Sequence, residues 1–232
     1  MAKTTIKKKK AKATKATKED SPIKEKELEL TEVDFMRLEM EQLQNGITIK
    51  GSLTDEITYG LDIDQKVIYL SGEIDQHSGN IFHQKMVAIL KFHGYDHEDP
   101  ITVNVSSYGG DVYSMLSIID SIQNCPCKVD TIGRGQIMSA AALILASGTG
   151  KRYMTENSWV MNHEISTMLA GQSSNIINES AHIQQLQDIF CNLLDKFTKR
   201  RKGFWSRKLR HNLYLTAEEA KKLKLIDKII GT

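Results

Sequence analysis

Short apolar runs alternate with amphipathic stretches along most of the chain. Beyond the first 65 residues, the runs at 67–70, 101–105 and 128–132 have the length and composition of buried strands. Two stretches between them, about 79–91 and 111–123, carry apolar residues at helical spacing. Alternating strand and helix units predict an α/β fold with a mainly parallel sheet covered by helices.

The second half of the chain continues the pattern with one unusually apolar helix. A helix beginning near Ser139 reads AAALILA, and a helix that is apolar all round is expected to be buried. Short strands are predicted at 152–154 and 159–162, and a last helix from the capping residue Thr216 to Lys222. Between them, residues 173–201 predict a long amphipathic helix. Its apolar positions are Ile176, Ile183, Leu186, Ile189, Phe190, Leu193, Leu194 and Phe197.

Residues 1–26 differ in composition from everything that follows. Eight lysines and no acid stand in the first 18 residues, and removing them from the 31 basic residues leaves 23 against 29 acidic ones. We interpret 1–26 as a disordered lysine-rich arm, 27–60 as a short helix with a loop segment, and 61–232 as the folded domain. Attraction of the arm to nucleic acid stays an alternative. No aromatic residue is present there to stack on bases, so we do not expect nucleic acid among the partners.

Several classes of protein do not fit the composition. No stretch is apolar for the roughly 20 residues that a membrane helix needs, and no signal-peptide core follows the first lysines. We therefore expect a cytoplasmic protein with no membrane partner. Three cysteines give no disulfide framework, and Cys125-Pro126-Cys127 lacks a second Cys/His pair at metal-binding spacing. We expect no metal and no bound cofactor.

Two segments suggest an acyl-transfer site. SSYGGDV, at 106–112, places Gly109 and Gly110 between a buried strand and a helix, where their amides can face an anion. Ser139 opens the buried helix after a glycine-rich strand exit, which suits a nucleophile with the Ala140 amide behind it as an oxyanion donor. From this segment alone, Ser139 as a simple helix N-cap remains an open interpretation.

A histidine supplies the base that a serine nucleophile requires. His163 follows the short apolar strand at 159–162 and leaves it for a loop. A serine hydroxyl needs a general base near neutral pH, and His163 is the candidate. The alternative is a surface histidine in a turn.

Taken together, these motifs resemble the ClpP family of self-compartmentalised serine peptidases over about Val67 to Ile230. Ser106–Gly110 is similar to the family's Asn-Ser-Pro-Gly-Gly turn, and Gly135–Ser139 to its Gly-Gln-x-x-Ser nucleophile motif. Val160–His163 is similar to its Val-Met-x-His strand. The segment at 146–152 and the closing segment at 215–230 also match the family in order and spacing.

The resemblance implies a fold, a reaction and an assembly. The fold would be a ClpP/crotonase-like spiral of repeated ββα units, with the helix at 173–201 as a protruding handle. Ser139 would be the nucleophile and His163 the base, and the amides of Gly109 (or Gly110) and Ala140 would form the oxyanion hole. The chain would form homo-oligomeric stacked rings and cleave unfolded polypeptides delivered by an AAA+ Clp-type unfoldase. That partner would use the ATP.

One departure from the family concerns the third member of the triad. Counting seven residues back from Leu215, where we place the family's Asp, gives Lys208. No carboxylate lies between Asp195 and Glu218, so His163 would lack an orienting acid. Asn212 or a backbone carbonyl could hold it instead. Two other functions therefore stay open: a non-catalytic subunit of a mixed ring, and a crotonase-type acyl-CoA enzyme on the same fold.

Overall fold

The computed structural model describes residues 60–95 and 98–231. The predicted lysine-rich arm and nearly all of the segment at 27–60 lie outside these residues. The elements are, in chain order, β1 Leu61–Asp62, β2 Val67–Ile74, α3 Gln76–His93, β3 Ile101–Gly110, α4 Val112–Gln123, β4 Val129–Met138, α5 Ala140–Ala146, β5 Arg152–Thr155, β6 Trp159–Asn162, α6 Ser173–Phe197, α7 Phe204–Lys208, β7 Leu213–Thr216, α8 Ala217–Lys222 and β8 Lys228–Ile230.

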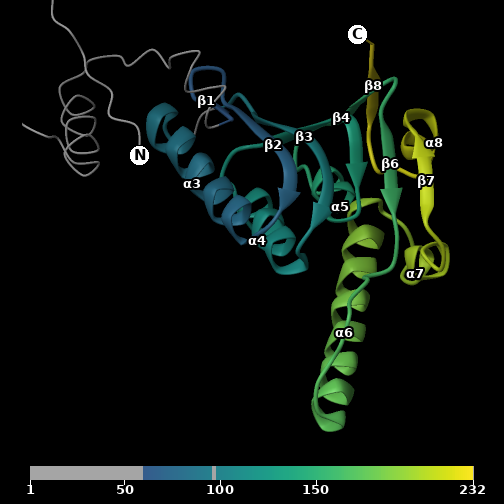
Figure 1. Cartoon of the computed structure of the whole chain (residues 1–232). Coiled ribbons are helices and arrows are strands. Elements are labelled where there is room, and N and C mark those ends of the chain that lie inside the picture. The colour runs from purple at the N-terminus through teal and green to yellow at the C-terminus, as the bar shows by residue number, and fades with distance from the viewer. Residues whose placement is uncertain (1–59, 96–97, 232) are drawn as a thin grey trace, which may run out of the picture. The chain divides into compact units, whose positions relative to one another are not determined.

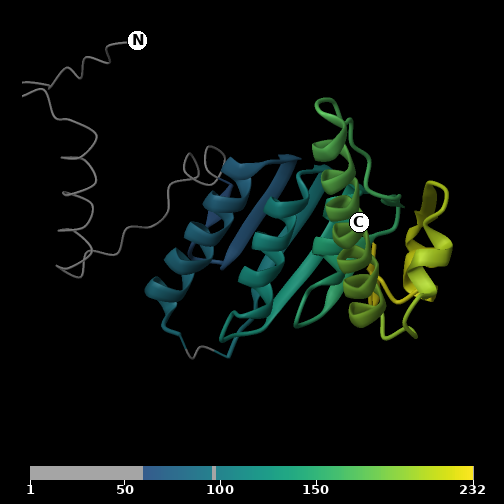
Figure 2. The same ribbon diagram turned by 90° about the horizontal axis from the view of Figure 1, so that it is seen from below.

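The described strands form one mainly parallel sheet in the order β1-β2-β3-β4-β5-β8, with β6 and β7 branching from β4. Among the described strands, only the pairs β1–β2 and β6–β7 are antiparallel. The predicted α/β class and the mainly parallel sheet are confirmed. Helices α3, α4 and α6 lie side by side across the sheet, and α6 extends away from it (Figure 1, Figure 2). The protruding handle is therefore also confirmed.

The branch arises from an irregularity near the end of β4. Val105 of β3 pairs with Gly133, but Ser107 pairs with Ile137, so two steps along β3 correspond to four along β4. Before this irregularity β4 pairs with β5, and after it β4 pairs with β6 through Met138. The chain therefore reaches Ser139 beside β6, one residue before α5 begins.

The core lies between the sheet and the helices. Every residue of α5 is buried, as the all-apolar sequence predicts. Along β3 the inward positions alternate from Ile101 to Gly109, and β3 itself runs beyond the predicted apolar stretch of 101–105. No helix in the described part is long and apolar enough to cross a membrane.

The start of α8 and the end of α6 differ in how well the sequence predicts their caps. Thr216 and Glu219 form the predicted capping box at the start of α8. The predicted helix at 173–201 instead ends at Phe197. Lys199 adopts φ 51°, and the Arg200 amide donates to the Asp195 carbonyl, which closes a Schellman motif without the usual glycine.

Candidate active site

Ser139 occupies a sharp turn between β4 and α5. Its backbone angles are φ 54° and ψ −122°, a region that non-glycine residues rarely adopt. Its N–H donates to the Met161 carbonyl of β6 at 2.7 Å, and its own carbonyl accepts from Ala142 at 3.0 Å. The strand pairing and the helix start together hold the serine in this conformation, the one described for nucleophile elbows.

The Ser139 side chain does not cap α5. No side-chain capping hydrogen bond is present, and the residue is only partly buried. A serine that served only as an N-cap would accept a hydrogen bond from an amide two or three residues on. The interpretation of Ser139 as a simple cap is therefore wrong, and its hydroxyl is available for chemistry.

The glycine turn at the end of β3 lies against Ser139. Gly109 has φ 99°, and a Cβ placed on it would stand 2.7 Å from the Met138 carbonyl and 2.8 Å from the Ser139 Cβ. Such separations are below van der Waals contact, so only glycine allows the backbone to come this close. This closeness is why the sequence needs a glycine at position 109, at the end of the strand that precedes β4 and Ser139.

The oxyanion donors expected from the sequence differ in how they are bonded. The Gly109 amide donates to the buried Ser107 hydroxyl at 3.0 Å, so it is not free to meet an oxyanion. Gly110 and Ala140 line a pocket beside Ser139, and Ala140 is the first residue of α5. The first amides of a helix have no partner within the helix. Of the two glycines, Gly110 is the one that lines this pocket, and which amide meets the oxyanion stays a prediction.

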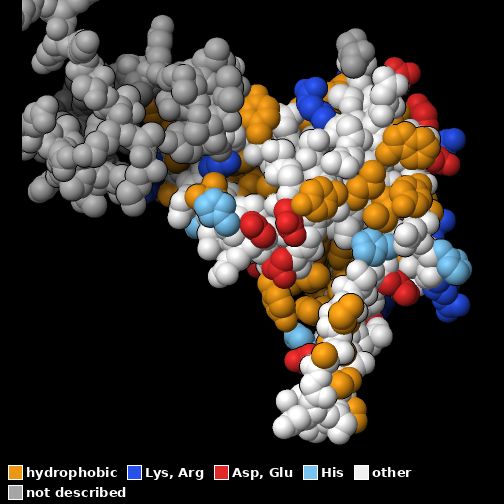
Figure 3. Space-filling model, in the orientation of Figure 1, with side chains coloured by type: hydrophobic (Ala, Val, Ile, Leu, Met, Phe, Trp, Pro, Cys, Tyr) orange, Lys and Arg blue, Asp and Glu red, His pale blue; other side chains and the backbone are white. Residues whose placement is uncertain are grey.

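The same pocket brings His163 to Ser139. It is a cavity of about 70 Å³, and the two side chains line it together with Gly110, Ala140 and five others. The remaining lining residues are Val112, Met115, Ile165, Ser166 and Phe190. Apolar side chains gather around the base of α6 in the space-filling view (Figure 3). Residues 24 positions apart in sequence thus share one small, mostly apolar pocket.

His163 is less firmly held than Ser139. It is partly buried, and no hydrogen bond joins its ring to Ser139 or to any other described residue. Hydrogen bonds between catalytic groups are often long in ligand-free enzymes and tighten only when substrate binds. The structure therefore brings nucleophile and base into one pocket without yet joining them.

Lys208 does not face this pocket. It is the last residue of α7, its side chain is exposed, and its Nζ lies 5.6 Å from the ring centroid of Phe204. This is a cation–π contact within one short helix. The residue obtained by counting back from Leu215 is thus engaged elsewhere.

Comparison with known proteins agrees with this geometry. The sequence model of the Clp protease family matches residues 51–232. ATP-dependent Clp protease proteolytic subunit 2 of Frankia casuarinae is 31% identical over 180 residues, which cover 75% of this chain and 82% of that protein.

The chain belongs to the Clp protease family. Subunit 2 from Mycobacterium tuberculosis is 30% identical over 175 residues, covering 74% of this chain and 80% of the relative. Subunit 1 from Mycolicibacterium paratuberculosis is also 30% identical over 175 residues, with 74% and 82% covered. Membership favours a peptidase over the crotonase-type enzyme.

In this Clp family member, a further contact positions the loop that follows His163. Gln187 of α6 accepts a hydrogen bond from the Ile165 amide at 2.8 Å, which ties the loop after His163 to the handle helix. Its other end donates to the Cys191 sulfur at 3.2 Å. The sequence does contain a signal for this contact, because Gln187 is a polar residue between Ile183 and Phe190 on the inward face of α6.

Other candidate nucleophiles in the Clp fold are less suitable. Burial raises the pKa of the Cys191 thiol, which keeps it neutral. Burial and the neighbouring Cys127 raise the pKa of Cys125 to about 12, and the two sulfurs lie 3.2 Å apart. Among the described residues no group of three His, Cys, Asp or Glu side chains is placed to hold a metal ion.

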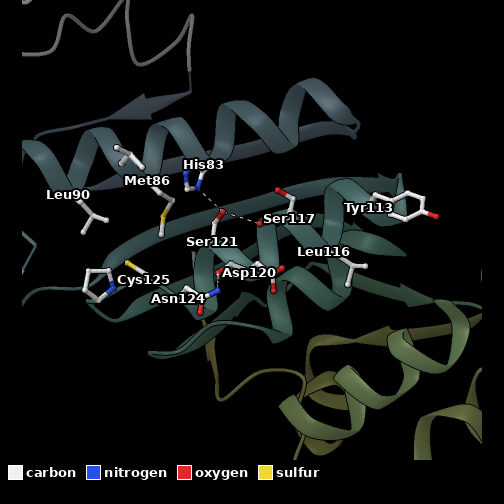
Figure 4. Close-up of a pocket in the computed structure, with 12 residues that line it drawn as sticks. His83, Met86, Leu90, Tyr113, Leu116, Ser117, Asp120, Ser121, Asn124 and Cys125 are labelled. Carbon is white, nitrogen blue, oxygen red and sulfur yellow. Dashed lines mark hydrogen bonds between the residues drawn. The ribbon is translucent and has the colours of Figure 1, made fainter. Parts of the chain in front are cut away.

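A groove of about 650 Å³ lies between α3 and α4, away from Ser139. His83 is hydrogen-bonded to Ser121 across it at 3.2 Å (Figure 4). The Ser121 hydroxyl in turn donates to the Ser117 carbonyl. Both serines lie within the regular helix α4, so neither occupies a strained turn. No glycine is among the described residues that line this groove, so it lacks the glycine backbone that lies against Ser139.

Proposed function

We propose that this chain is a serine endopeptidase subunit in which Ser139 is the nucleophile and His163 the general base. The single observation that carries the proposal is the strained conformation of Ser139, held against the Gly109 backbone in a pocket that His163 also lines. Strain of this kind persists where surrounding contacts enforce it, and it exposes the hydroxyl to substrate.

The proposed reaction proceeds by acyl transfer. His163 accepts the proton of the Ser139 hydroxyl while the oxygen bonds to the scissile carbonyl carbon, and the imidazolium then protonates the leaving amine. The amides of Ala140 and Gly110 stabilise the oxyanion, each donor of this kind being worth about 10²–10³ in rate. Water then hydrolyses the acyl-enzyme by the same route. No cofactor takes part.

The proposal includes assembly into stacked rings that receive unfolded polypeptides from a Clp-type ATPase. The relatives are named proteolytic subunits of ATP-dependent Clp proteases, which supports a separate ATPase as partner. Large apolar side chains on and before α6 also support an interface: Met168 is 94% exposed, Ile177 69% and Ile189 43%. Their exposure in a single subunit is what a ring contact would cover.

Substituting Ser139→Ala tests the peptidase directly. We expect hydrolysis of an unfolded protein such as casein to fall to background, with the melting temperature and oligomeric state unchanged because the hydroxyl makes no capping bond. A variant that still hydrolyses casein at the wild-type rate would rule out Ser139 as the nucleophile. A Ser117→Ala variant in the α3–α4 groove is the matched control.

A second candidate is a non-catalytic subunit of a mixed ring. The observation that favours it is His163, whose ring has no hydrogen-bond partner among the described residues and for which the segment 196–217 offers no carboxylate. Purified homo-oligomer that neither hydrolyses casein nor reacts with a fluorophosphonate at Ser139 would support this candidate.

A further inference from the structure

The strand β6 lies between the two segments that a histidine base has to connect. On one side it runs parallel to β4, with Met161 opposite Met138, the residue before Ser139. On the other side it runs antiparallel to β7, with Asn162 opposite Leu213. His163 is the next residue along β6, and Asn212 precedes Leu213.

Extended by one residue beyond the last pair, the antiparallel register would place Asn212 opposite His163. Directly opposed residues in an antiparallel pair project from the same face, with Cβ atoms about 4.5–5.5 Å apart. An asparagine side chain at that separation reaches an imidazole nitrogen. Ser139, His163 and Asn212 thus stand in the order that a nucleophile, its base and an orienting group require.

No neighbouring residue competes with Asn212 as the group that orients His163. Lys208 lies in α7, before the turn that leads into β7, and its ammonium group contacts Phe204. No aspartate or glutamate occurs from residue 196 to residue 217. The group expected opposite His163, one residue before β7, is consequently a neutral amide.

We propose that Asn212 is the positioning residue for His163. This inference rests on the proposed function. No hydrogen bond between these two side chains is present among the described residues, and it would form when substrate tightens the site. The Asn212 Oδ1 would then accept the Nδ1–H of His163 and leave Nε2 as the acceptor for the Ser139 proton. A Cys-His-Asn arrangement in papain-like proteases shows that an amide can hold a catalytic histidine.

An amide performs only part of the work of a carboxylate. It fixes the tautomer and orientation of His163, but it carries no charge to stabilise the imidazolium that forms when Ser139 attacks. The wild-type enzyme should therefore be slow. The acidic limb of its pH–rate profile should lie at lower pH than in a variant with a carboxylate at position 212.

Few other ionisable groups can confuse such a profile. The remaining residues lining the pocket of Ser139 and His163 are uncharged. Glu164 follows His163, His211 precedes Asn212, and Asp188 follows Gln187 on α6; all three side chains are exposed. They are unchanged in the variants below, so their contribution cancels in the comparison.

The test compares Asn212→Asp, Asn212→Ala and the control Lys208→Asp, which introduces the same charge in α7. Two readouts are followed from pH 5.5 to pH 9: kcat/KM for a fluorogenic peptide and the rate of fluorophosphonate labelling at Ser139. Asn212→Asp is expected to raise both at least tenfold, up to the ~10⁴ that a carboxylate is worth in serine proteases of other folds, and to move the acidic limb to higher pH. Asn212→Ala is expected to lower both about tenfold, and Lys208→Asp to change neither.

Two results would overturn the proposal. One is wild-type rates and an unmoved pH profile in both Asn212 variants; the other is a gain in Lys208→Asp equal to that in Asn212→Asp. Because Asn212 is exposed, all variants should fold, which circular dichroism verifies. Labelling at Ser139 separates the two levels: if Ser139 reacts but position 212 has no influence, only the role of Asn212 fails. If Ser139 reacts in none of the variants, the proposed function itself fails.

Discussion

The two halves of the candidate site are held with very different rigidity. Ser139 is fixed by β6 on one side, by the first turn of α5 on the other, and by the Gly109 backbone pressed against it. His163 follows the end of a four-residue strand, and the loop after it is tied to α6 by the Gln187–Ile165 hydrogen bond. The nucleophile is preorganised by the core of the subunit, whereas the base depends on a helix that extends away from it.

This contrast indicates where the subunit would be regulated. Groups built into a buried core keep their geometry whatever the surface contacts, because interiors are close-packed. A base positioned through a protruding helix responds to anything that binds the helix. Ring assembly would then affect His163 and leave Ser139 in place.

The largest effect is expected from crowding the nucleophile side. Gly109→Ala would place a Cβ 2.7 Å from the Met138 carbonyl, so the turn and Ser139 must separate. We expect kcat/KM to fall about 10²–10³-fold, because a displacement of about 1 Å at a reacting group has effects of this size. Gly72→Ala is the matched control: Gly72 also has positive φ, at 78°, but a Cβ there meets nothing within 4 Å. Equal activity losses in the two variants would contradict the steric account.

The second effect concerns the ion pair between Arg152 and Asp227. Arg152 donates to the Asp227 carboxylate at 2.6 and 3.0 Å and to the carbonyls of Phe197 and Lys224 at 3.0 Å. Asp227→Asn should lower the free energy of unfolding by about 1–2 kcal/mol, less than a fully buried pair because the Asp227 side chain is 38% exposed. Denaturant unfolding at pH 7 measures it, with Asp64→Asn, at an exposed carboxylate, as control.

The same ion pair has a defined pH dependence. Hydrogen bonds from Arg152 hold the pKa of Asp227 below its ordinary value of 3.8. Its contribution is therefore complete above about pH 4 and disappears as the pH falls through the lowered pKa. Wild type and Asp227→Asn should converge in stability in strong acid. A constant difference from pH 7 to pH 2 would show that the charge of Asp227 is irrelevant.

A third effect is expected on the base side through assembly. Ile189 is 43% exposed on α6, between the buried residues Leu186 and Phe190. Ile189→Asp should dissociate the oligomer and lower peptidase activity about tenfold while leaving the subunit folded, because an apolar contact becomes a buried charge. Light scattering and circular dichroism measure the two properties. Gln185→Asp adds the same charge at a polar, exposed position of α6 and should leave the oligomer intact.

The smallest effect tests the tether of the base loop. Gln187→Ala removes the acceptor of the Ile165 amide, worth about 1 kcal/mol as a net hydrogen bond, or roughly fivefold in rate. We expect kcat to fall by about this factor with little change in fluorescence-detected melting. Gln184→Ala, at an exposed position of the same helix, should have wild-type kcat. A loss of stability without a loss of kcat would make Gln187 a purely structural residue.

Local patterns in the sequence predicted the longer helices and the central strands, but not the short strands β1, β7 and β8 or the contacts between element ends. The strand at 159–162 and the capping box of Thr216 were predicted correctly because both depend on a few adjacent residues. α7 was not predicted. Its start is held by the buried Asp195 carboxylate, which accepts from the amides of Gly203 and Trp205. A helix of five residues that depends on a side chain in another element leaves no periodic signal.

The candidate site shows the same division. Ser139 and His163 stand in motifs that are readable from the chain, and the structure brings both to one pocket. Lys208 was chosen by counting residues, but the short helix α7 and the turn after it decide which residue faces β6. The register of β7 therefore had to be seen before Asn212 could be distinguished from Lys208. The Gly109–Ser107 hydrogen bond was equally hidden, because it joins a backbone amide to an ordinary buried serine.

Covalent labelling of the purified wild-type oligomer with a fluorophosphonate, followed by mapping of the modified peptide, tests the central claim most directly. The account predicts a single adduct on Ser139, formed more slowly in His163→Ala and absent in Ser139→Ala, while Ser117 and Ser121 stay unmodified. An adduct on another serine, or labelling of Ser139 at the same rate when His163 is replaced, would contradict the assignment of Ser139 and His163 as nucleophile and base.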